Sequence, residues 1–104
     1  MNTRTFSALA EPNRLRIVEL LRDRPHSVNE IATHLELRQP QVSKHLQSLS
    51  KAGLVTVHPV AQQRIYALQP EPFQQLDDWL NSFERSWTKR LSKLDVYLER
   101  MKEG

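Results

Sequence analysis

The sequence predicts a mainly α-helical domain of the α+β class, with four short helices, a β-hairpin and one long final helix in 104 residues. Three observations carry this prediction. Apolar residues recur every three or four positions over most of the chain, as in amphipathic helices. The alternation typical of strands is confined to residues 54–68, and residues that start or stop helices separate the segments. The length suits a single domain, residues 1–104.

Two helices are expected at the start of the chain. The first covers residues 3–10 and carries Phe6 and Leu9 on one side. Pro12 fits the first turn of the second helix, where its missing N–H costs nothing, and this helix extends to about Asp23. The positions expected to be buried in the second helix are Leu15, Ile17, Val18 and Leu21.

Two further helices separated by a short turn follow over residues 27–52. Ser27 and Glu30 have the spacing of a capping box at the start of the third helix. Pro40 lies in the first turn of the fourth helix, and Gly53 follows its last turn, where a left-handed backbone is favoured. This order predicts a helix-turn-helix unit.

A hairpin and a long helix complete the chain. Residues 54–58 alternate as a strand does, and residues 64–68 form the returning strand, so the hairpin covers residues 54–68. Pro59 has no N–H to pair, which places the first strand at the edge of the sheet. From residue 71 to residue 102 the pattern is helical without a break.

The segment from residue 37 to residue 70 contains no acidic residue, although the chain has 12. Within it, Val42, Leu46 and Leu49 fall on one side of the fourth helix, and polar side chains occupy the other side. Because amides, hydroxyls and cations suit phosphates and base edges, we expect this surface to bind double-stranded DNA. Ser27 is a further expected contact, because helix starts and hydroxyls bind phosphates. The expected contacts from the fourth helix are Gln39, Gln41, Ser43, Lys44, His45, Gln47 and Lys51.

Three motifs resemble the successive signatures of ArsR-type winged-helix repressors, and the resemblance extends from residue 4 to about residue 100. They are FSALAEPNR at residues 6–14, QPQVSKHL at residues 39–46 and LSKAGLV at residues 49–55. The resemblance implies a dimeric, sequence-specific transcriptional regulator, usually a repressor, whose recognition helix covers residues 39–52. It also implies that the hairpin is a wing that lies along the minor groove or the DNA backbone, with Arg64 as its contact.

Two positions depart from the family pattern. Arg38 stands where the family usually has a capping Ser, so the cap of the fourth helix must come from elsewhere. The turn at residues 60–63 has no glycine, and Arg64 is the only cation of the wing. The wing is therefore a weaker part of the expected DNA surface than the recognition helix.

No metal or other cofactor is expected. The chain has no cysteine, so disulfides and thiolate ligands are excluded. Relatives of this type often sense metals through paired cysteines on the third helix, but those positions here hold Ala32 and His34. The four histidines include no i, i+4 pair suited to zinc. We interpret His34 as a surface or boundary residue, and His45 as a DNA contact or a scaffold hydrogen-bonder.

The helix predicted at residues 71–102 carries an apolar stripe along its whole length. About 30 residues at ~1.5 Å each extend roughly 45 Å, longer than one small domain needs, so a second copy is the expected cover. The resemblance likewise implies dimerisation through residues 3–10 and 71–102. A dimer would place two recognition helices roughly 34 Å apart and select a palindromic operator. The expected interface residues are Phe6, Leu9, Phe73, Leu76, Leu80, Phe83, Trp87, Leu91 and Leu94.

Other functions fit parts of the same pattern. Trp79, Phe83 and Trp87 could line a small-molecule pocket, although the persistence of the stripe favours an interface. The aromatic C-terminal helix could instead bind a heterologous protein, which would make the chain a protein-interaction module. An enzyme is not expected, because Asp77 and Asp78 are adjacent and point about 100° apart on a helix.

The expected location is the cytoplasm, on the nucleoid when the protein binds DNA. The first residues lack an apolar signal core, and no apolar run approaches the roughly 20 residues of a membrane span. Residues 1–69 carry nine Lys and Arg against five Asp and Glu, so the positive field lies on this part of the chain. The leading hypothesis is a homodimeric repressor of transcription. The sequence identifies no effector ligand.

Overall fold

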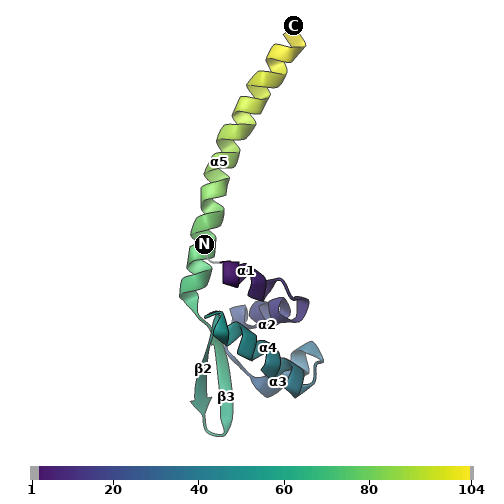
Figure 1. The fold of residues 1–104 in the computed structure, drawn as a ribbon, viewed down its shortest axis with the longest axis vertical. Coiled ribbons are helices and arrows are strands. Elements are labelled where there is room, and N and C mark those ends of the chain that lie inside the picture. The colour runs from purple at the N-terminus through teal and green to yellow at the C-terminus, as the bar shows by residue number, and fades with distance from the viewer. Residues whose placement is uncertain (1–2, 104) are drawn as a thin grey trace. The chain divides into compact units, whose positions relative to one another are not determined.

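The helices and strands follow the predicted order, with one added strand (Figure 1). The structure is a computed structural model that describes residues 3–103. Residues 3–73 form one compact unit, which we call the N-terminal domain, and α5 from Gln74 onward forms a second unit. The elements are α1 (Thr3–Leu9), α2 (Pro12–Asp23), β1 (His26–Ser27), α3 (Val28–Leu35), α4 (Gln39–Lys51), β2 (Val55–Val60), β3 (Gln63–Leu68) and α5 (Pro70–Glu103).

The mainly helical α+β class is confirmed, and the sequence pattern missed only the short strand β1 among the described elements. β1 pairs antiparallel with β3, with His26 opposite Tyr66, and gives a sheet of order β1-β3-β2. Two residues are too few to show an alternating pattern, and the pairing depends on a partner far away in the sequence. β2 is an edge strand, as Pro59 indicated, and Pro59 lies opposite Arg64.

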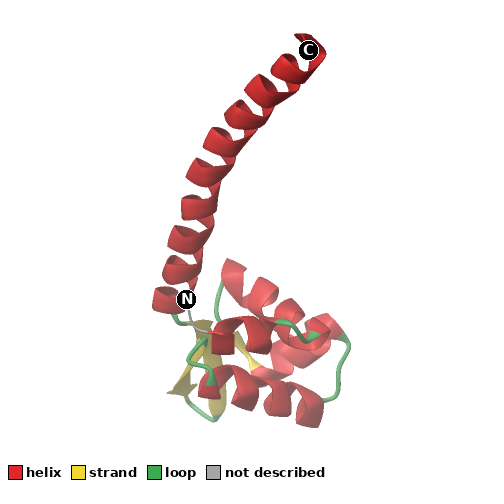
Figure 2. Ribbon diagram, turned by 45° about the horizontal axis from the view of Figure 1, so that its top comes forward, coloured by secondary structure: helices red, strands yellow, loops and turns green. Residues whose placement is uncertain are grey.

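One hydrophobic core holds the N-terminal domain together. Helices α2, α3 and α4 contribute most of it, and the small sheet packs at one edge of the helical group (Figure 2). Tyr66 from β3 also belongs to this core. The largest fully buried side chains are Ile17, Ile31, Val42, Leu46, Leu49 and Leu54.

The expected burial of Leu15 is wrong, because its side chain is 41% exposed. The other three positions expected to be buried in α2, Ile17, Val18 and Leu21, do lie in the core. At 100° per residue, Leu15 is turned roughly 110° from the mean direction of those three side chains, so it points away from the core side of α2.

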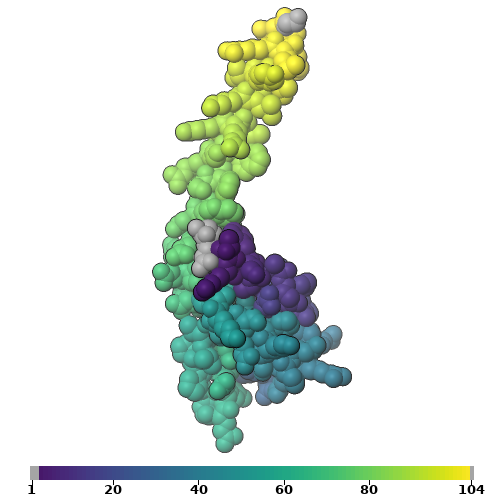
Figure 3. Space-filling view, in the orientation of Figure 1, coloured from purple at the N-terminus to yellow at the C-terminus, as the bar shows by residue number. Residues whose placement is uncertain are grey.

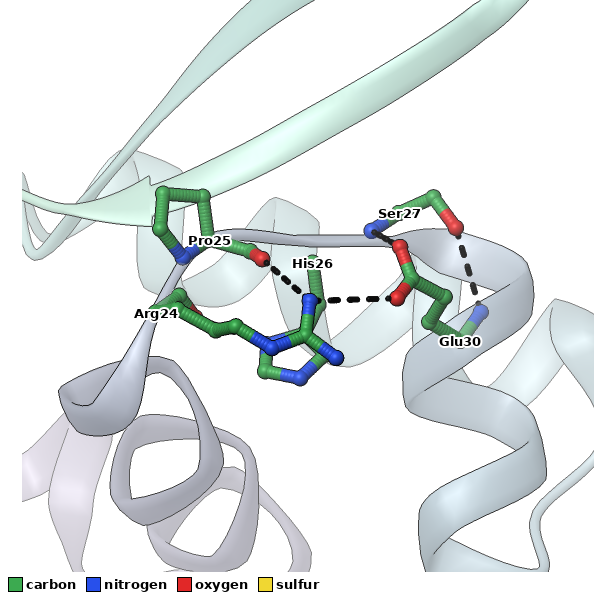
Figure 4. A network of polar contacts seen from close by, with 5 residues as sticks. All are labelled: Arg24, Pro25, His26, Ser27 and Glu30. Atoms are coloured by element: carbon green, nitrogen blue, oxygen red, sulfur yellow. Dashed lines mark hydrogen bonds and ion pairs between the residues drawn. The ribbon is translucent and has the colours of Figure 1, made fainter.

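The start of α3 is held by the capping box that the sequence predicts (Figure 4). The Glu30 N–H donates to Ser27 Oγ at 3.2 Å, and the Ser27 N–H donates to Glu30 Oε1 at 3.1 Å. Arg24 Nη1 lies 3.4 Å from the other carboxylate oxygen, Oε2. The backbone hydrogen bond from Ser27 is the largest cause that lowers the pKa of Glu30, and the Ser27 hydroxyl and Arg24 lower it further.

The end of α4 depends on a left-handed glycine, as expected. Gly53 has φ +77°, which a side chain would disfavour. The Leu54 N–H donates to the Leu49 carbonyl and the Gly53 N–H donates to the Ser50 carbonyl, both at 3.0 Å. These two bonds satisfy carbonyls of the last turn and lead the chain directly into β2.

Replacing Glu30 with Gln is expected to lower the free energy of unfolding at neutral pH. A folded-state pKa below the unfolded value means that the carboxylate stabilises the fold above its unfolded pKa. This contribution is lost as the pH falls through the folded pKa. The difference between wild type and Glu30→Gln in urea unfolding should therefore shrink toward about pH 3, where carboxylates are largely protonated. Glu19→Gln, which removes an exposed carboxylate from α2, is the control for the loss of one negative charge.

Candidate nucleic-acid interface

The orientation of α4 is set by its buried side. Val42, Leu46 and Leu49 are each 0% exposed, so this side of the helix is completely covered by the N-terminal domain. The other side carries no acidic residue, and its polar side chains are available at the surface. The exposed members of the expected DNA surface on α4 are Gln39, Gln41, Ser43, Lys44, Gln47 and Lys51.

Gln41 makes the side-chain hydrogen bond at the start of α4. Arg38 occupies the N-cap of α4, and a guanidinium group has no acceptor for the helix N–H groups. The Arg38 N–H instead donates to Gln41 Oε1 at 3.3 Å. The side-chain oxygen of Gln41 is thus used by its own helix, while its NH₂ group can still donate to a base or a phosphate.

His45 joins α4 to the start of α2. Its Nδ1 lies 3.6 Å from Glu11 Oε2, and its side chain is 20% exposed. Glu11 Oε2 also accepts the Arg14 N–H at 2.8 Å, which makes Glu11 the N-cap of α2. Of the two roles expected for His45, the contact favours the scaffold role, because the ring is directed at a carboxylate of the domain.

A polar hollow of about 270 Å³ lies between the starts of α3 and α4 and the hairpin turn. We call it the α3–wing hollow. It brings Ser27, Gln39, Ser43 and Arg64 of the expected contacts together, although they come from three separate segments. Three polar residues that the sequence pattern did not identify as contacts also line the hollow: Asn29, Gln62 and Gln63. The two adjacent glutamines of the hairpin turn are the only signal in the sequence that indicated any of them.

Ser27 is placed differently from its expected role. Its residue is 3% exposed, its hydroxyl oxygen accepts the Glu30 N–H, and its own N–H donates to Glu30. The structure therefore gives Ser27 a role in the α3 cap. The sequence pattern identified the cap correctly, but it could not show that the cap would bury the side chain.

The hairpin turn contains one strained residue. Ala61 has φ +56°, a left-handed conformation that glycine adopts more readily. Ala61 therefore takes the left-handed position that a glycine usually occupies in such a turn, and it connects β2 to β3. Arg64 is exposed next to this turn, on β3.

The apolar stripe of α5 is exposed in the single chain. No residue of this 34-residue helix is buried. Leu9 and Phe73, by contrast, pack against the core of the N-terminal domain, and Leu76 is half-buried. The exposed members of the expected dimer interface are Phe6, Leu80, Phe83, Trp87, Leu91 and Leu94.

Trp79, Phe83 and Trp87 form no sizeable pocket among the described residues. Trp79 and Phe83 meet edge to face with ring centroids 4.8 Å apart. The hollow beside Phe83 and Trp87 is about 110 Å³, below the ~300 Å³ at which small-molecule sites begin. A small-molecule pocket lined by Trp79, Phe83 and Trp87 is therefore not supported.

Among residues 3–103, no group of three or more His, Cys, Asp or Glu side chains is arranged to hold a metal ion. His34, for which the sequence suggested no partner, packs its ring edge-on against the buried ring of His26, with centroids 5.5 Å apart. None of the helices in this part of the chain is long and apolar enough to cross a membrane.

A helix-turn-helix with a polar, acid-free second helix, followed by a β-hairpin, defines a winged helix-turn-helix DNA-binding domain. Residues 11–57 match the sequence profile described as "Bacterial regulatory protein, arsR family". The chain is 38% identical over 89 residues to the HTH-type transcriptional regulator Rv2034 of Mycobacterium tuberculosis, covering 86% of this chain and 80% of that protein. The chain belongs to the ArsR family of transcriptional regulators.

Two other comparisons agree with this assignment. The transcriptional repressor SdpR of Bacillus subtilis is 30% identical over 78 residues, covering 75% of this chain and 87% of that protein. The solution structure of Mb0332 from Mycobacterium bovis, described as a homodimeric winged helix-turn-helix DNA-binding domain, superposes with a TM-score of 0.67 at 28% identity. That superposition covers 80% of this chain and 77% of that chain.

Replacing Ala61 with Gly is expected to raise the free energy of unfolding by about 0.5–1 kcal/mol, because relief of the left-handed strain outweighs the added freedom of the unfolded chain. Ala67→Gly in β3, where φ is negative, should instead lower it by about 0.5–1 kcal/mol. Urea unfolding of both variants measures the two changes. Equal destabilisation by both variants would show that Ala61 is not strained.

Proposed function

We propose that the protein is a homodimeric transcriptional repressor that binds a palindromic operator in double-stranded DNA. The observation that carries this proposal is the acid-free, exposed side of α4, held in place by three fully buried side chains on the opposite side. A surface of this kind is complementary to a polyanion, and the helix that carries it has the length of a major-groove reading helix.

The exposed side of α4 from residue 39 to residue 47 is the proposed base-reading part. Gln39 and Gln47 carry free amide groups, which can pair with adenine, and the Lys44 ammonium can donate to guanine. Ser43 and Gln41 supply further donors on the same exposed surface. Base contacts of this type select sequence, whereas phosphate contacts hold the domain in register.

The α3–wing hollow is the proposed phosphate-binding part. Arg64 approaches from β3, and Asn29 and Ser43 approach from the starts of the two helices. A DNA strand that passes the start of α4 would meet these donors together, so the wing would contribute through Arg64 and the amides of its turn. Lys51, in the last turn of α4, is also proposed to contact the DNA backbone. His45 is proposed to support DNA binding indirectly, because its contact with Glu11 positions α4.

The dimer is proposed from the unburied stripe of α5. Side chains such as Phe83, Trp87 and Leu91 are each close to half exposed, and an exposed apolar surface of this extent is typical of an interface. The related Mb0332 domain is described as homodimeric. Two copies related by a twofold axis would present two α4 helices to successive major grooves roughly 34 Å apart, which selects a palindromic site.

Repression is proposed because the related SdpR is described as a transcriptional repressor. A dimer that occupies its operator tightly blocks other proteins from the same DNA. This mechanism needs no catalytic residue or cofactor, and it places the protein on the nucleoid in the cytoplasm.

Lys44→Glu is expected to weaken operator binding at least about tenfold, because it removes a base donor and adds a charge that phosphates repel. A gel-shift titration with DNA fragments retained by the wild-type protein measures this loss. Lys102→Glu, which makes the same charge change near the end of α5, is the control and should keep near wild-type affinity. Unchanged binding by Lys44→Glu would exclude α4 as the reading helix.

Trp87→Ala is expected to weaken the dimer by about 2 kcal/mol or more, as truncation of a central aromatic interface residue does. DNA affinity should fall with it, because single domains cannot bridge two half-sites. Sedimentation equilibrium and gel shift measure the two effects. Val96→Ala is the matched control, since Val96 lies on the opposite side of α5 and is also about half exposed.

Two outcomes of these measurements would contradict the proposal. One is a Trp87→Ala protein that stays dimeric with wild-type DNA affinity. The other is a wild-type protein that is a stable monomer and fails to retard DNA, which would favour a protein-interaction module that binds a heterologous partner through α5.

A further inference from the structure

Three cationic side chains converge on a second hollow, which lies between α1, the first turn of α2 and the last turns of α4. We call it the α1–α4 hollow. Its volume of about 470 Å³ falls within the ~300–1,000 Å³ of small-molecule sites. Arg4, Arg14 and Lys51 line it together with the hydroxyls of Ser7 and Ser48, and no acidic side chain does. Figure 3 shows α1 in purple beside the teal end of α4 on the visible face of the molecule.

Arg14 is fixed in the wall of this hollow before any ligand binds. Its Nε donates to the Ala8 carbonyl at 2.6 Å, and its Nη2 donates to the Ser7 carbonyl at 3.2 Å. A guanidinium group has five N–H donors, so three remain for a ligand. Because the side chain is already ordered, binding would cost little additional conformational entropy.

The end of α4 supplies the opposite wall. The Lys51 ammonium is exposed and makes no hydrogen bond or ion pair with residues 3–103. The Ser48 hydroxyl makes only a long bond of 3.4 Å to the Lys44 carbonyl, which a ligand can replace. Small side chains, Ala8 and Ala52, complete the lining and leave room between the charged groups.

The helix ends that border the hollow do not cancel its positive charge. Carbonyls at a helix end carry partial negative charge, which would repel an anion. At the end of α1 these carbonyls are covered by Arg14. At the end of α4, the carbonyls of Leu49 and Ser50 accept the N–H groups of Leu54 and Gly53. The side chains that line the hollow therefore keep a net positive charge.

We propose that the α1–α4 hollow binds a phosphoryl group through Arg14, Lys51 and Arg4. A phosphate monoester has several acceptor oxygens and up to two negative charges, which match a guanidinium fork, an ammonium and two hydroxyls. The phosphoryl group can belong to a free metabolite or to a DNA backbone, and the two sources share the same chemistry.

A free phosphoryl ligand would also act on DNA binding, a consequence that rests on the proposed function. The ligand would join α1, which carries Phe6 of the proposed dimer surface, to α4, which carries the reading surface. A ligand that binds the free and DNA-bound dimers with different affinity changes the DNA affinity by the same factor. The hollow would then be the site of an anionic effector.

The test is a ¹H–¹⁵N NMR titration of the full chain with inorganic phosphate, against chloride at equal ionic strength. The expected result is saturable movement of the Ser7, Arg14 and Lys51 amide signals by phosphate alone. Lys51→Gln should weaken phosphate binding about fivefold, the value of one exposed ion pair. Ser48→Asp, which places a carboxylate in the hollow, should abolish it. Lys93→Gln on α5 is the matched control and should bind phosphate as the wild type does.

Repeating the titration with a DNA duplex bound distinguishes the two sources. Phosphate that still binds the duplex complex identifies a free-anion site, and phosphate that the duplex displaces identifies a backbone contact. If phosphate moves the signals no more than chloride does, and duplex leaves these amides unmoved, the proposal is wrong. A protein that binds phosphate but no duplex would keep this site and overturn the DNA-binding proposal instead.

Discussion

The burial of Val42, Leu46 and Leu49 is the constraint on which the candidate interface depends. Each of these side chains is 0% exposed, and exposing one side chain of this size costs about 1.5–3 kcal/mol. A shift of α4 by one residue would turn it 100° and expose all three, so the helix has one stable rotation in the domain. The polar surface of α4 therefore points where it does because of apolar packing on the other side, and not because of its own polar contacts.

Polar contacts then fix the ends and the flank of this helix. Gln41 accepts the Arg38 N–H at the start of α4, and Gly53 ends the helix. His45 contacts Glu11 at the start of α2. Glu11 serves two elements at once, because the same carboxylate oxygen caps α2 and faces the His45 ring. Each end of α4 is thus defined by a residue within or next to the helix, whereas its position relative to α2 depends on a longer-range contact.

The distinction between local and long-range contacts also explains what the sequence could predict. The periodicity of α4, the Ser27–Glu30 cap and the extent of α5 depend on neighbours within a few residues, so the sequence pattern predicts them well. β1 pairs with a strand far along the chain, and the approach of Asn29 to the wing depends on tertiary packing. No local pattern contains this information. Leu15 is an intermediate case, since its position on the helix was calculable but the side of α2 that faces the core was not.

The structure adds most by showing which polar atoms the fold already uses. The side chains of Ser27, His45 and Arg14 each have contacts within the domain. Gln39, Lys44 and Lys51 are exposed and have no such contacts among residues 3–103. Their grouping on one acid-free helix therefore has no structural explanation and calls for an outside partner with acceptor groups. The same reasoning applies to the exposed apolar stripe of α5. Because no residue of this helix is buried, the stripe stabilises the helix only when another surface covers it. DNA would satisfy the first requirement and a second copy of the chain would satisfy the second, so the proposed repressor dimer on its operator would meet both at once.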